Sequence, residues 1–118
     1  MGAIRLLGCL FALALCPTIA YAHAQLDHTS PSVGSTVKSA PSEVRMWFSQ
    51  PLEPKFTTAQ LRSSSGTVVA TGGVDTADPK QIVIRVNALP AGRYKVFWKV
   101  LSVDTHHTEG SFSFEVKP

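Results

Sequence analysis

Residues 94–101 read YKVFWKVL, and the alternation in this stretch decides the fold class. Successive side chains of a β-strand point to opposite faces, so the even-numbered residues of this run share one face. That face consists of Tyr94, Val96, Trp98 and Val100, while the other face mixes lysines with Phe97 and Leu101. The pattern predicts a long strand whose even-numbered side chains lie in a hydrophobic core.

Shorter runs with the same alternation occur on both sides of this strand, separated by Gly, Pro, Ser and Asp residues that favour turns. They lie near residues 25–29, 44–48, 59–61, 67–70, 82–86 and 112–116. No apolar stripe of helical period is longer than two turns. The sequence therefore predicts an all-β domain, an immunoglobulin-like Greek-key β-sandwich of about seven strands, with an open barrel as the alternative.

A second signal for the sandwich precedes the long strand. Leu89, Gly92 and Tyr94 resemble the tyrosine corner of such domains, in which the phenol bonds to the backbone a few residues upstream. Val96 stands where antibody domains carry a cysteine, so we expect packing to replace the inter-sheet disulfide.

The first 22 residues differ from the rest of the 118-residue chain. Arg5 precedes an apolar run over residues 6–15, and a small-residue A-x-A triplet ends at Ala22. This layout predicts a cleaved signal peptide over residues 1–22 and one domain over residues 23–118, because the apolar run is shorter than the roughly 20 residues that span a membrane. Both cysteines, Cys9 and Cys16, lie in the leader. We expect an exported protein without disulfides or a membrane span.

The chain has 11 basic and 8 acidic residues, and Arg5 belongs to the leader. This small excess argues against a nucleic-acid-binding surface.

Cleavage after Ala22 would make His23 the first residue. A histidine at a free N-terminus can chelate a metal through its amino nitrogen and its near ring nitrogen together. The α-amine has an ordinary pKa of about 7.7 to 8.0, so a strong Lewis acid displaces its proton at neutral pH.

Further metal-ligating residues follow the long strand in Asp104-Thr105-His106. If that strand continues past Val100, Asp104 and His106 share one face, while His107 points away. We expect His107 and His28 to be solvated surface residues. In a Greek-key sandwich the first strand and the end of the long strand can reach the same end of the domain, which would bring His23 to this pair.

Amine, imidazole and carboxylate donors together form the nitrogen and oxygen set that Cu(II) favours in tetragonal geometry. Zn(II) prefers a tetrahedron and binds such donors less tightly. Met46 is the single methionine after the leader, so no thioether cluster for Cu(I) is expected. The sequence predicts a Cu(II) site made of His23, Asp104 and His106.

Several ordered motifs make residues 23–118 similar to the CopC-like periplasmic copper-binding proteins. They are His23-Ala24, 29-TSP-31, 40-APSEV-44, 48-FSQPLEP-54, 89-LPAGRY-94, 102-SVDTH-106 and 110-GSFSF-114. The resemblance implies a Greek-key sandwich in which the N-terminal histidine and the D-x-H pair bind Cu(II). It also implies a periplasmic location, a role in copper homeostasis or resistance, and a CopD-type inner-membrane copper transporter as partner.

One position departs from the family pattern. Many relatives carry glutamate where this chain has Gln50, and a neutral amide adds no negative charge beside a copper ion. We expect Gln50 and Ser102 to supply hydrogen bonds that hold the ligands in place.

Two other functions remain open. A copper enzyme resembling a lytic polysaccharide monooxygenase would use a similar terminal-histidine site, although the domain is short for that class and shows no nucleophile or base for turnover. An adhesive or scaffolding sandwich would bind copper only weakly. A binding protein rather than an enzyme is the prediction.

Overall fold

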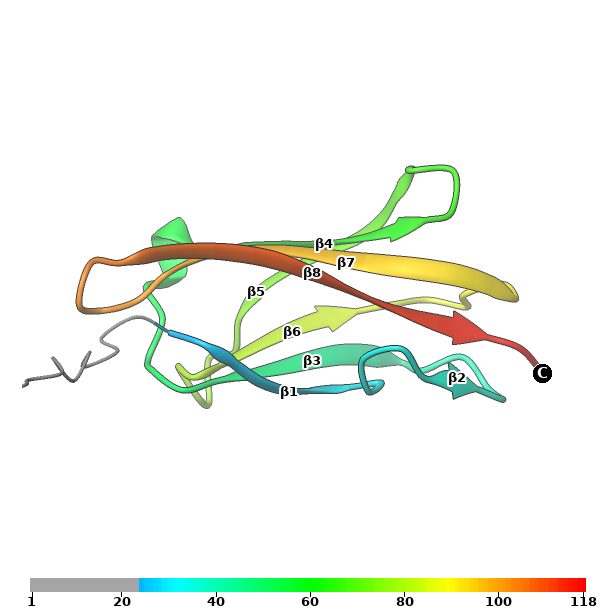
Figure 1. Ribbon diagram of the computed structural model, residues 1–118, viewed down its shortest axis with the longest axis horizontal. Coiled ribbons are helices and arrows are strands. Elements are labelled where there is room, and N and C mark those ends of the chain that lie inside the picture. Colours follow the sequence, from blue (N-terminus) through cyan, green and yellow to red (C-terminus); the bar gives the residue numbers. More distant parts are fainter. Residues whose placement is uncertain (1–23) are drawn as a thin grey trace, which may run out of the picture.

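The computed structural model describes residues 24–118, and these form eight β-strands and one short 3₁₀ helix (Figure 1). The strands are β1 (Leu26–Ser30), β2 (Thr36–Val37), β3 (Glu43–Phe48), β4 (Thr58–Ser63), β5 (Val68–Val74), β6 (Gln81–Arg85), β7 (Gly92–Leu101) and β8 (His107–Val116). The helix η1 covers Pro54–Phe56.

The strands form two layers that are joined through β5. Hydrogen bonding links them in the order β1-β3-β6-β5-β4-β7-β8-β2. Figure 1 shows β4, β7 and β8 in one layer and β1, β3 and β6 in the other, with β5 running between them. Neighbouring strands are antiparallel except for β2, which runs parallel to β8. The prediction of an all-β sandwich is confirmed.

The long strand predicted from residues 94–101 is β7, and it pairs with β8 along its full length of ten residues. Its even-numbered side chains are all buried, whereas Lys95 and Lys99 are exposed and Phe97 is half-buried. The core joins these side chains to buried apolar residues of β3, β4, β6 and β8, while β1, β2 and β5 contribute only half-buried apolar residues that pack against it. Its largest fully buried members include Phe114, Met46, Leu52, Leu61, Ile82 and Ile84.

The tyrosine corner is present. The Tyr94 hydroxyl donates a hydrogen bond of 2.5 Å to the carbonyl oxygen of Pro90. Gly92, between these two residues, has a φ of +151°, which glycine adopts without a steric penalty. Val96 is fully buried at the position of the antibody cysteine, as expected if packing replaces a disulfide.

Two strand predictions were incomplete. The two-residue β2 was not foreseen, because such a short segment shows no alternation. The strand predicted near residues 67–70 is longer than expected, since Gly72 also belongs to β5 and pairs with Ile84. A Cβ atom at Gly72 would lie 2.1 Å from the carbonyl oxygen of Val83, so the glycine permits close approach of β5 and β6.

The predicted signal peptide, both cysteines and His23 lie outside the described residues. Within residues 24–118, no helix has the length and apolar character that crossing a membrane requires.

The contact between β7 and β8 depends on Gly110. A Cβ atom there would lie 2.5 Å from Cζ2 of Trp98, so Gly110→Ala should lower the free energy of unfolding by about 1–3 kcal/mol through overpacking. Gly73→Ala is the matched control, since its Cβ meets nothing within 4 Å, and it should change stability by less than about 0.5 kcal/mol. Urea denaturation measures both, and equal effects would contradict this packing.

Candidate metal site

A tight turn, residues 102–106, connects β7 to β8 and carries the predicted ligand pair. The amide of Ser102 donates to the carbonyl of His106 at 3.0 Å, and the amide of Thr105 donates to the carbonyl of Ser102 at 2.8 Å. Thr105 has a φ of +72°, in the left-handed region. The backbone therefore reverses within these five residues.

The long strand does not continue to Asp104 and His106, as the sequence pattern suggested. The alternation of β7 was extended to Asp104 and His106, but β7 ends at Leu101. The two side chains come together because the turn folds them toward each other and not because they share a strand face.

Asp104 and His106 lie close enough to act on one ion. The Oδ1 atom of Asp104 is 3.4 Å from Nδ1 of His106, and the two side chains are 30% and 51% exposed. Two donor atoms bound at about 2.0–2.2 Å to one metal ion lie roughly 2.8 to 4.4 Å apart, depending on the angle between them. The observed separation falls within this range, so the pair fits a metal ion.

The carboxylate of Asp104 is held in its ionised form. The Ser102 hydroxyl donates a short hydrogen bond to Oδ1 of Asp104, and the amide of His106 donates to the same atom at 3.4 Å. The Ser102 bond is the largest cause that lowers the pKa of Asp104 below its ordinary value of 3.8; burial opposes it, and hydrogen bonding and charge from His106 lower the pKa further. Metal ligation requires this deprotonated form.

The start of the described chain is tied to the same end of the domain. The Thr108 hydroxyl donates to the carbonyl oxygen of Ala24 at 3.2 Å, and Ala24 is buried. Thr108 lies two residues beyond His106. Figure 1 shows the beginning of β1 at the end of the sandwich where the β7–β8 turn lies.

The loop of residues 49–53 supports both segments. Gln25 and Ser49 bond twice, with the Gln25 amide donating to the Ser49 hydroxyl and the Ser49 amide donating to the Gln25 carbonyl, each at 2.9 Å. The amide of Val103 donates to the carbonyl of Pro51 at 3.1 Å. A bridge also pairs Leu52 with the fully buried Ser102. Three distant parts of the sequence therefore meet here.

The remaining candidates take up different positions. Gln50 is half-buried in this loop, and no hydrogen bond joins its side chain to the described part of the site. The Ser102 hydroxyl donates to the carboxylate of Asp104. His107 begins β8 and is exposed. His28 is 59% exposed and stacks on Trp47 with a centroid distance of 4.3 Å.

Within residues 24–118, no group of three or more His, Cys, Asp or Glu side chains could hold a metal ion. The described part of the site contributes two such side chains, Asp104 and His106. Two hydroxyl residues that the sequence did not single out, Thr108 and Ser49, anchor Ala24 and Gln25. Serine and threonine are common in turns and on sheets, so nothing in their local sequence marks them.

Known proteins resemble this chain in sequence and in fold. The copper resistance protein C of Escherichia coli is 37% identical over 107 residues, covering 83% of this chain and 84% of the relative. The crystal structure of CopC from Methylosinus trichosporium OB3b matches with a TM-score of 0.76 at 30% identity, over 81% of this chain and 95% of that one. PcoC from Escherichia coli, described as methionine-rich, matches at 0.72 and 38% identity, over 81% and 100%.

Fold and similarity together define a small β-sandwich of the kind found in copper resistance proteins. The CopC domain model matches residues 26–117. The chain belongs to the CopC family.

The hydrogen bond from Ser102 generates a prediction about the metal-free protein. Removing the hydroxyl with Ser102→Ala should raise the pKa of Asp104 toward its ordinary value, whereas Ser111→Ala, on the exposed side of β8, should not. A carboxyl NMR titration measures this, and an unchanged pKa in Ser102→Ala would contradict the account.

The same bond has a consequence for stability. A carboxylate whose folded pKa lies below its unfolded value stabilises the fold above the unfolded pKa and loses that contribution as pH falls through the folded pKa. The acid-induced loss of stability below about pH 4 should therefore be smaller in Ser102→Ala than in the parent protein.

Proposed function

We propose that this protein binds Cu(II) in the periplasm and sequesters it or delivers it to a CopD-type membrane transporter. The ligands are His23, through its amine and imidazole, together with Asp104 and His106. The chain acts as a copper carrier in homeostasis or resistance. Copper is its cargo.

One observation carries the proposal: the hydrogen bond between Thr108 and the carbonyl of Ala24. A residue bonded to Ala24 has its Cα atom about 3.8 Å away from that of Ala24. The bond holds Ala24 against Thr108, which lies two residues beyond His106, and so beside the turn that carries Asp104 and His106. This supports His23, the residue that precedes Ala24, as the third ligand beside Asp104 and His106.

The donor set favours the cupric ion. Carboxylate and imidazole are hard and borderline ligands, and among divalent first-row metals copper binds such sets most tightly. A soft thioether site is not supported, because Met46, the one methionine of residues 24–118, is fully buried in the core. This chain differs in that respect from its relative PcoC, whose description calls it methionine-rich.

A carrier is favoured over the oxidative enzyme. The Escherichia coli relative is named copper resistance protein C and not as an enzyme, and the similarity extends across most of this chain and of that relative. The signal-like leader supports export. Copper-loaded protein should release no oxidised sugars from chitin or cellulose in the presence of peroxide.

The ligand assignment predicts which substitutions weaken Cu(II) binding. Asp104→Asn and His106→Ala should each weaken Cu(II) binding by at least about tenfold and change the electron paramagnetic resonance spectrum, since each removes one donor. His107→Ala is the matched control, because this exposed neighbour begins β8 and should leave affinity and spectrum unchanged.

Competition titration with a Cu(II) chelator measures the affinities. An effect of His107→Ala as large as that of His106→Ala would contradict the assignment.

A further inference from the structure

The outer face of the β4–β7–β8 layer carries four cations. Arg62 on β4 and Arg93, Lys95 and Lys99 on β7 take part in no ion pair with the described residues. The cations of the other layer are arranged differently. Arg45 pairs with Glu43 and Asp75, each at 2.8 Å, and Arg85 lies 3.5 Å from Glu43.

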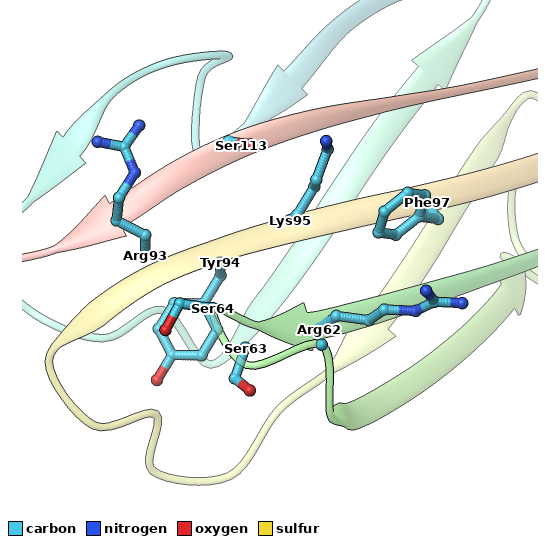
Figure 2. A pocket seen from close by; sticks show the side chains of 9 residues that line it. Arg62, Ser63, Ser64, Arg93, Tyr94, Lys95, Phe97 and Ser113 are labelled. Atoms are coloured by element: carbon cyan, nitrogen blue, oxygen red, sulfur yellow. The ribbon is translucent and has the colours of Figure 1, made fainter.

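Phe97 lies at the centre of this basic face. The guanidinium carbon of Arg62 is 4.5 Å from the centroid of its ring, and Nζ of Lys95 is 5.4 Å from the same centroid. Figure 2 shows Phe97 and Lys95 projecting from β7 and Arg62 extending beneath the ring from β4. The half-buried ring thus holds two cations near one point of the surface.

The placement of Arg62 opposite Lys95 does not stabilise the sheet. Arg62 and Lys95 are register partners on neighbouring strands, and like charges directly opposite each other destabilise a sheet. The guanidinium of Arg62 is also fixed by two hydrogen bonds to Oε1 of Gln60, at 2.8 and 3.2 Å. A neutral amide orients this cation without neutralising it.

A shallow cavity of about 310 Å³ opens between these side chains. Its lining includes Arg62, Arg93, Lys95, Phe97, Ser63 and Ser113. With Tyr94 also in the lining, the cavity combines three cations, two aromatic rings and serine hydroxyls, a set suited to carboxylates on an apolar backbone.

We propose that this face binds an acidic, extended segment of a partner protein. The cations of β7 follow intervals of two residues, about 6.8 Å each: Arg93 and Lys95 are one interval apart, and Lys99 lies two intervals beyond Lys95, past Phe97. An extended peptide that carries Asp or Glu at every second residue presents its carboxylates at the same spacing. The segment lies along β7 and places its charges against Arg93, Lys95 and Lys99, with Arg62 reaching it from β4.

The charge pattern favours a protein over an anionic membrane. Glu109 and Glu115 on β8 stand in register with Lys99 and Arg93, so the face carries both signs. A uniformly negative lipid surface would be repelled by these carboxylates, whereas a peptide that follows β7 avoids them. The cavity lies toward the start of β7, and six residues of strand, about 20 Å, separate Lys95 from Leu101 at the edge of the metal-site turn. A segment that reaches Lys99 would end two residues, about 7 Å, before Leu101 at that turn.

The test uses a fluorescent peptide, (Glu-Thr)₅, and a block peptide, Glu₅Thr₅, of the same composition, titrated against the exported protein at low salt. Binding should weaken by about fivefold or more in the double variant Arg62→Gln/Lys95→Gln. The control Lys38→Gln/Lys117→Gln removes the same charge from exposed positions elsewhere and should change the dissociation constant by less than about twofold. Phe97→Ala should also weaken binding, and circular dichroism verifies that all variants fold.

Three results would overturn the proposal. The first is equal weakening in both double variants, which would mean that net charge alone acts. The second is equal affinity for the alternating and block peptides, which would remove the match to strand spacing. The third is binding to phosphatidylglycerol vesicles that depends on Arg62 and Lys95 while the peptide does not bind, which would assign the face to a membrane.

Discussion

The pairing of β7 with β8 is the constraint on which the rest of the molecule depends. Ten residues of each strand are in register, and this ladder places Tyr94, Val96, Trp98 and Val100 in the core. The same ladder ends in a turn at one extreme of the sandwich, where Asp104 and His106 meet. Its outer side carries the alternating cations around Phe97. The β7–β8 hairpin therefore contributes to the core, carries the turn with Asp104 and His106, and bears most of the basic face.

The hairpin alone does not complete the site. Its turn is held by residues that lie far away in the sequence, because Pro51 accepts a bond from Val103 and Thr108 donates one to Ala24. These two bonds bring the start of the domain, a middle loop and the late turn to one place. The copper-binding function that we propose depends on this convergence more than on any single side chain.

Much of the fold could be predicted from the sequence, because alternation is a local property. The buried face of β7, the tyrosine corner and the sandwich class all follow from residues within one strand or turn. The strand β5 was only partly recognised, since Gly72 acts through its closeness to β6, a contact that no local pattern reveals. The two-residue β2 is equally invisible, because its pairing with β8 joins segments far apart in the chain.

The candidate site was predicted in composition but not in geometry. Asp104 and His106 are recognisable by residue type and spacing, yet a turn and not a strand face brings them together. The anchoring roles of Thr108 and Ser49 could not be foreseen, since each depends on a hydrogen bond to a residue more than twenty positions away. His23 remains a prediction from the leader and from the resemblance to the family.

The most direct measurement compares cupric affinity for two forms of the processed chain. One begins at His23, and the other carries a single glycine ahead of it, with a glycine added at the C-terminus as the control. If the terminal amine and the turn share one ion, the N-terminal addition weakens binding by orders of magnitude and the C-terminal addition has no effect. Equal affinity in all three would contradict the account.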